Sequence, residues 1–283
     1  YDVEDKTYQA IIRHRAEITK CSQPRVLEEL YRLLRGGAAR RSLELLAETG
    51  VAASLSQHLA LLFGARSDTS LDTEAGSESD SEDSEDWSET WTDDDQPIAE
   101  EAQSPTSFSP SFVDAEALED GRYHEERMNL AWNVLGQVDR LVAEDRPTSN
   151  ALVLSCLVAA FVLPELLADD VRPAEASDMV DEVLQPLISQ IGVARRDAER
   201  TSQILLAQKR LLPSKRRVKP MALVKRDYFD EALTLYELMA AAQGEVAPEL
   251  EFWRKLQQED AGDRDDQAQR RRRRGGRRRR RGA

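Results

Sequence analysis

The stretch from Ser22 to Gly50, SQPRVLEELYRLLRGGAARRSLELLAETG, predicts two helices joined by a tight turn. Ser22 favours a helix N-cap, and Pro24 is tolerated in a first turn because its missing N–H has no partner there. The pair Gly36-Gly37 ends the first helix, and Gly50 stands where a C-cap belongs. Apolar residues recur at helical spacing in both halves: Val26, Leu27, Leu30, Leu33 and Leu34, then Leu43, Leu45 and Leu46.

The same helical periodicity continues outside residues 66–122. Val51 to Phe63 predicts a third helix, and the apolar run from Ala151 to Leu167 predicts a central buried helix. Further helices are expected between Pro173 and Gly192, from about Asp197 to Leu212, and as a last pair within 221–242. No useful β-alternation is visible. We therefore expect an all-α fold, a neck and body helical bundle with a disordered acidic insert and a disordered basic tail.

Charge is segregated along the chain, although the net charge of its 283 residues is −14. Between Ser67 and Gly121 there are 19 Asp and Glu and no Lys or Arg, and this polar composition favours disorder. The last residues hold ten arginines around Gly275-Gly276. We expect four parts, which are a neck at 1–65, an acidic insert at 66–122, a helical body at 123–258 and an arginine-rich tail at 259–283.

Two segments resemble one enzyme family. The order Ser-x-x-Arg-Val-x-x-Glu, Leu-Leu, a glycine turn and LLAETG is similar to the neck of the template-independent RNA nucleotidyltransferases, which comprise the bacterial poly(A) polymerases and the CCA-adding tRNA nucleotidyltransferases. Residues 208–257 resemble the C-terminal RNA-binding region of the poly(A) polymerases, which an arginine-rich tail follows. This ending favours poly(A) polymerase over the CCA-adding alternative.

The resemblance implies a transferase that uses ATP and Mg²⁺ to add poly(A) to RNA 3′ ends, in mRNA processing and RNA turnover with RNA-decay proteins. The family's catalytic head carries a Gly-Ser motif and a strand-borne Asp-x-Asp that holds two metals. Neither can be placed here, because Asp93–Asp95 lies in a polar acidic run without a strand. We expect the C-terminal part of a larger enzyme, inactive alone and without bound cofactor. A non-catalytic RNA-binding protein remains the alternative of another class.

The resemblance also places Arg25 and Glu29 on the neck helix that faces the incoming nucleotide. These two residues are spaced as an i,i+4 pair, which alone stabilises a helix. Between positions 209 and 226 no acidic residue interrupts the basic ones, and such a cluster attracts a phosphate backbone. The predicted RNA-binding residues are Lys209, Arg210, Lys215, Arg216, Arg217, Lys219, Lys225, Arg226, Arg270, Arg271, Arg272, Arg273, Arg274, Arg277, Arg278, Arg279, Arg280 and Arg281.

Three aromatic residues beside this cluster have two interpretations. Tyr228, Phe229 and Trp253 are able to stack RNA bases or to pack in the helical core, and core packing is favoured for the last two.

Composition excludes other classes. The longest apolar run is too short and too broken to span a membrane, and no signal peptide is visible. Cys21 and Cys156 have no metal-ligand spacing, so we expect reduced thiols and no metal site. Reduced thiols fit a cytoplasmic location, and no membrane partner is expected.

Overall fold

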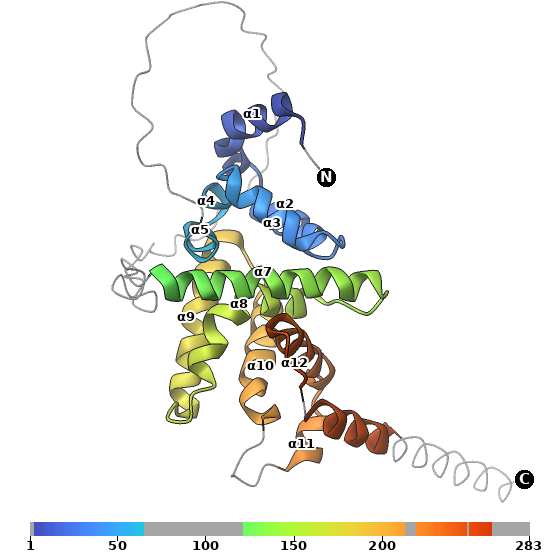
Figure 1. The fold of residues 1–283 in the computed structure, drawn as a ribbon. Helices are drawn as coiled ribbons and strands as arrows, with labels where there is room; N and C mark the ends of the chain where they lie inside the picture. Colours follow the sequence, from blue (N-terminus) through green and yellow to red (C-terminus); the bar gives the residue numbers. More distant parts are fainter. Residues whose placement is uncertain (1–2, 65–120, 213–218, 248, 262–283) are drawn as a thin grey trace, which may run out of the picture. The chain divides into compact units, whose positions relative to one another are not determined.

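The computed structural model describes residues 3–64, 121–212, 219–247 and 249–261, which form helices joined by turns and short loops (Figure 1). These residues contain no strand, so the predicted all-α class is confirmed. The acidic insert and the arginine-rich tail lie outside the described residues. The elements are α1 (Asp5–His14), η1 (Arg15–Lys20), α2 (Gln23–Leu34), α3 (Ala39–Glu48), α4 (Val51–Leu55), α5 (Gln57–Leu62), α7 (Gly121–Ala143), α8 (Asn150–Leu166), α9 (Pro173–Ile191), α10 (Arg195–Leu211), α11 (Pro220–Val224), α12 (Phe229–Gln243) and a helical segment at 249–261.

The predicted hairpin is present as α2 and α3. Ser22 occupies the N-cap of α2, although its hydroxyl accepts no capping hydrogen bond. Gly37 turns the chain at φ 78°, a left-handed conformation that suits glycine. Of the apolar residues that recur at helical spacing, Leu33 is 40% exposed, whereas Tyr31, which was not among them, is only 3% exposed. The buried face of α2 follows positions 27, 30, 31 and 34, which leaves position 33 on the outer side.

The N-terminus of α3 is capped from a distant part of the chain. Its own N-cap residue is Ala38, which has no side-chain acceptor. The Asp139 carboxylate on α7 accepts instead, from the backbone N–H of Ala39 at 2.5 Å and of Arg40 at 3.3 Å. This contact satisfies two amides that a helix start leaves open and fixes α3 to α7.

The single helix predicted over 51–63 is wrong, because the structure has α4 and α5 there. Ser56 is extended between them, and its hydroxyl accepts a hydrogen bond from the Leu59 N–H at 3.2 Å. The same hydroxyl donates to the Gln190 side chain on α9 at 2.6 Å. A serine that finds both partners favours a helix start over a helix interior.

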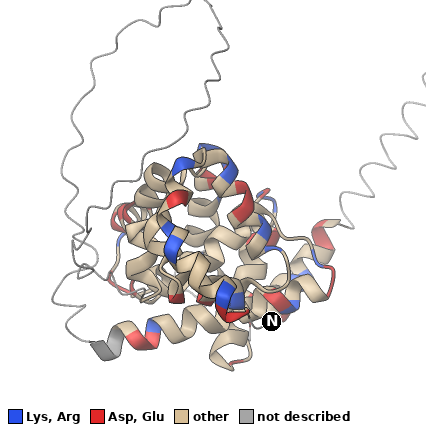
Figure 2. Cartoon of the chain, turned by 90° about the horizontal axis from the view of Figure 1, so that it is seen from above, with Lys and Arg blue, Asp and Glu red and all other residues tan. Residues whose placement is uncertain are grey.

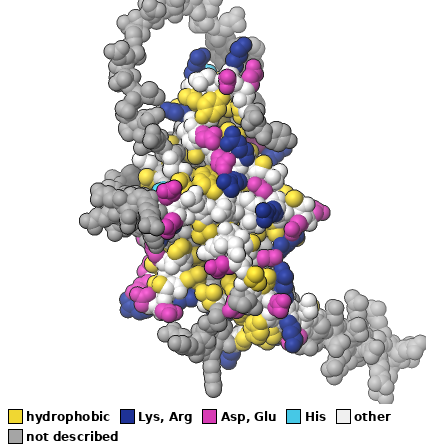
Figure 3. Space-filling model, viewed as in Figure 1, with side chains coloured by type: hydrophobic (Ala, Val, Ile, Leu, Met, Phe, Trp, Pro, Cys, Tyr) yellow, Lys and Arg dark blue, Asp and Glu magenta, His cyan; other side chains and the backbone are white. Residues whose placement is uncertain are grey.

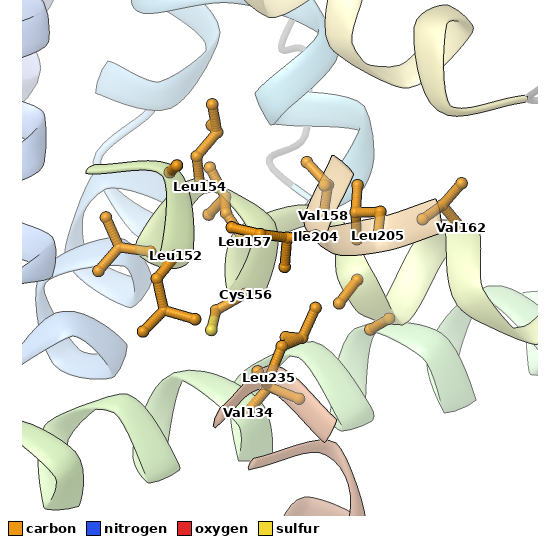
Figure 4. Packing of buried hydrophobic residues seen from close by; sticks show 14 of the residues in the cluster. Val134, Leu152, Leu154, Cys156, Leu157, Val158, Val162, Ile204, Leu205 and Leu235 are labelled. Carbon is orange, nitrogen blue, oxygen red and sulfur yellow. The ribbon is translucent and has the colours of Figure 1, made fainter. Parts of the chain in front are cut away.

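The predicted central helix is confirmed as α8. It contacts α7, α9, α10 and α12, and almost all of its side chains are buried. Figure 4 shows how its residues meet side chains of three neighbouring helices, with Val134 on α7, Ile204 and Leu205 on α10, and Leu235 on α12. Burial on every side is the arrangement that an apolar helix with no polar face requires. No helix in the described ranges has the length and apolar character to cross a membrane.

One buried histidine makes stability depend on pH. His58 on α5 is 8% exposed, and burial lowers its pKa from 6.5 to about 4. The unfolded chain therefore binds the proton first, so the contribution of this group is complete above pH 6.5 and is lost as pH falls toward 4.

We expect His58 to contribute about 2 kcal/mol less to the free energy of unfolding at pH 5 than at pH 8. Urea denaturation of the wild type and of His58→Gln at both pH values measures it. Carboxylates titrate in both proteins, so the difference between their pH dependences of unfolding free energy reports His58 alone. An equal pH dependence in both would contradict the prediction.

Candidate nucleic-acid interface

The predicted nucleotide-binding residues lie on the first turns of α2. Arg25 and Glu29 are both exposed. Glu29 pairs with Arg32 at 3.4 Å, one turn further on, rather than with Arg25 as their spacing suggested. Within the described part of the chain Arg25 has no ion-pair partner, so its guanidinium is available to a ligand.

Lys209 differs from the other predicted RNA-binding residues in its surroundings. Its ammonium donates to the backbone carbonyls of Ala168 at 2.7 Å and Val171 at 2.8 Å, in the turn that follows α8. Two of its three donors are thereby used inside the fold, where they satisfy carbonyls left open after the helix ends.

Three predicted cations gather around the short helix α11. Lys219 is its N-cap, Lys225 its C-cap and Arg226 the next residue, and all three are exposed. We call them the α11 cations. Lys225 is 3.9 Å from the Asp260 carboxylate, which is a distant contact for an exposed side chain. The α11 cations are therefore placed to meet an anion from solvent.

The remaining predicted cations are either partly covered or undescribed. Arg210, in the last turn of α10, is half-buried. Lys215, Arg216 and Arg217, and all ten arginines from Arg270 to Arg281, lie outside the described residues.

Two of the three aromatic residues beside the basic cluster pack in the core. Phe229 is fully buried and Trp253 is 4% exposed, with their ring centroids 5.8 Å apart. The Trp253 indole N–H donates to the Leu211 carbonyl at the end of α10, at 2.9 Å. Core packing, the favoured interpretation of both residues, is confirmed, and neither ring is free to stack a base. Tyr228 is half-buried beneath the Arg200 guanidinium, 5.8 Å from its ring centroid.

An aromatic residue missed by the sequence analysis is the exposed one. Phe252 is 50% exposed and meets Trp253 edge to face, with centroids 5.2 Å apart. Adjacent residues on a helix point about 100° apart, so only one of two neighbouring aromatics is able to face the core. The sequence therefore indicates that one of these two rings lies outside the core. The structure shows that it is Phe252, whose exposed face is open to a base.

Charge on the described helices is mixed. Figure 2 shows Lys and Arg scattered among Asp and Glu over the helices, and Figure 3 shows both signs interspersed on the visible face. Asp and Glu outnumber Lys and Arg among the described residues. Attraction for a polyanion therefore depends on particular exposed cations and on the basic segments at 213–218 and 270–281, rather than on the net charge of the bundle.

The described residues do not fit the two-metal site that the chemistry of the resembled family requires. They contain no group of three or more His, Cys, Asp or Glu side chains able to hold a metal ion. Near Arg25 the one predicted carboxylate is Glu29, which already pairs with Arg32.

Comparison with known proteins gives two family matches. The model described as the probable RNA and SrmB-binding site of polymerase A matches residues 1–62. The model described as the polymerase A arginine-rich C-terminus matches residues 170–283. A search of curated proteins found no match. The first match contains α1 to α5, and the second contains the α11 cations.

Proposed function

Because the chain belongs to the poly(A) polymerase family and carries its RNA-binding domain, we propose that it holds RNA while adenylates are added to the RNA 3′ end from ATP. The α11 cations grip phosphates, and the basic tail extends the grip. Arg25 and Glu29 contact the incoming nucleotide. The reaction itself requires two Mg²⁺ ions and a site that the described residues do not form. The added poly(A) promotes RNA turnover in this proposal, with RNA-decay proteins as partners.

One observation carries the RNA-binding part of the proposal. The RNA-binding family model covers residues 1–62, and the exposed α11 cations lie in the second matched segment. Single-stranded RNA needs cations that follow its backbone together with aromatic faces for its bases. Lys219, Lys225 and Arg226 supply the first, and Phe252 supplies the second.

We expect replacement of Lys219, Lys225 and Arg226 by Gln to weaken binding of single-stranded RNA roughly 25-fold at 0.1 M salt. Lys225 also lies near Asp260, so we count only the phosphate contacts of Lys219 and Arg226, whose removal takes about 1.4 from the slope of log K against log salt. Filter-binding titrations at several salt concentrations measure affinity and slope together. All base sequences are expected to lose affinity equally, because phosphate contacts do not read bases.

Arg140→Gln is the control. This exposed residue is on α7, between the two matched segments, and its side chain contacts Gln137 at 3.4 Å. We expect it to keep the wild-type affinity. If the triple variant also keeps the wild-type affinity and slope, the α11 cations do not contact RNA and the proposal loses its described interface.

A further inference from the structure

One arginine on α10 holds the turn that follows α11. Arg200 Nε is 2.6 Å from the Glu231 carboxylate in the first turn of α12, and Arg200 Nη1 is 2.8 Å from the Asp227 carboxylate. Its Nη2 donates to the Asp227 backbone carbonyl, and its guanidinium carbon is 5.8 Å from the ring centroid of Tyr228. A single side chain therefore fixes both the backbone and the carboxylate of the residue that directly follows the α11 cations.

The Asp227 carboxylate lies beside a cation that we propose to bind phosphate. Asp227 directly follows Arg226, and its side chain is 84% exposed. Residues this close in the chain place their charges within about one Debye length, roughly 10 Å at 0.1 M salt. A carboxylate without a cation here would attract Arg226 and repel an RNA phosphate. The ion pair with Arg200 offsets that charge.

The other carboxylates at this end of the molecule do not depend on Arg200, apart from Glu231. Asp230 accepts a hydrogen bond from a neutral amide at 2.6 Å, which leaves its charge in place. Asp260 is 4% exposed and lies near one of the α11 cations. Within the described part of the chain, Asp227 and Glu231 each have one ion pair, and both are with Arg200. Loss of Arg200 would therefore add two carboxylates without a cation to the surface beside α11.

We propose that Arg200 is a positioning residue for RNA binding, which holds Asp227 so that Arg226 faces an RNA phosphate and not its own neighbour. Arg200 itself does not contact RNA. The fork of a guanidinium meets two carboxylates and a carbonyl at once, which the single ammonium of a lysine cannot reproduce. The inference rests on the proposed RNA-binding function, and it adds a residue that acts through the α11 cations.

The test is filter binding of single-stranded RNA to the full chain and to its variants over a salt series. Arg200→Gln is expected to weaken binding about threefold to fivefold at 0.1 M salt, in the range of exposed charge interactions. Asp227→Asn in the same chain should recover most of the loss, because it removes the charge that Arg200 no longer offsets. The loss should also shrink as salt rises, since screening weakens the repulsion.

Two readouts separate this charge effect from damage to the fold. Asp227 is exposed, so its replacement by Asn should restore RNA affinity without restoring the unfolding free energy that Arg200→Gln removes, as urea denaturation measures. Arg200→Lys gives a milder variant should Arg200→Gln not fold. It keeps the charge but lacks the fork, so we expect about a twofold loss that Asp227→Asn again recovers.

Arg195→Gln is the matched control, since it removes an arginine of the same helix that is 91% exposed and pairs with Glu199 at 2.8 Å. It should keep the wild-type affinity. Wild-type affinity in Arg200→Gln, a loss that Asp227→Asn does not recover, or an equal loss in the control would each overturn the inference. The α11 cation variant separates the two proposals. If it loses affinity while Arg200→Gln does not, the proposed function stands and only the role of Arg200 is wrong.

Discussion

Truncation after Gln269 is expected to weaken RNA binding about 25-fold to about 3,000-fold at 0.1 M salt, which corresponds to removal of two to five phosphate contacts. The reason is the density of charge, since ten arginines are separated only by glycine and each guanidinium is able to fork a phosphate. The slope of log K against log salt should flatten by about 0.7 for each phosphate that the shortened chain no longer neutralises. Filter binding of the full and truncated chains across a salt series measures both quantities.

Deletion of the acidic insert gives a second variant for this experiment, with the opposite expected effect. The insert places 19 carboxylates in the same chain as the tail, and we expect these to compete with RNA for the arginines. Deletion of 68–120 with a short flexible linker should therefore tighten RNA binding, most visibly at low salt. A truncated chain with unchanged affinity and slope would show that the tail takes no part, and the α11 cations would then carry the binding.

Phe229→Ala is expected to lower the free energy of unfolding by about 3–5 kcal/mol, the usual range for removing a buried aromatic ring. Phe229 is fully buried and packs on Trp253, whose indole N–H caps the end of α10. The cavity would loosen the packing between α11, α12 and the segment at 249–261. Urea denaturation followed by circular dichroism measures the decrease.

Phe252→Ala is the matched control, because the same ring is removed from a position that is 50% exposed. Its free energy of unfolding should fall by about 1 kcal/mol. Its affinity for single-stranded RNA should fall about fivefold or more if the exposed ring stacks a base. Equal destabilisation by the two substitutions would mean that Phe252 also belongs to the core.

The helices were predictable from sequence wherever apolar spacing and local stop signals agreed. Gly37 and Gly192 end helices with left-handed backbone, and Pro173 begins one, as their residue types indicate. Prediction was wrong where a distant partner decided the outcome. Ser56 divides 51–63 because Gln190, far along the chain, is within hydrogen-bond distance of its hydroxyl.

The candidate sites show the same limit. Exposed cations such as Lys219 and Arg226 could be named from charge alone. The internal use of Lys209 could not, because the carbonyls that it contacts belong to a turn about forty residues earlier. A pocket lined by the end of α2 and the first turns of α8, α10 and α12 was beyond prediction for a related reason, since each helix contributes polar residues that are unremarkable in isolation. Periodicity predicts elements, whereas these sites arise from packing between them.

The Asp139 cap bears on how the chain is to be cut for biochemical work. The RNA-binding match ends at residue 62, yet the carboxylate that closes the start of α3 comes from α7, beyond that boundary. The buried face of α2 likewise belongs to one hydrophobic cluster with α8 and α9. An expression fragment that stops at 62 lacks both the cap and the apolar surface beneath it. Soluble fragments for RNA studies should therefore retain α7 to α9, even though neither family match covers α7 or α8.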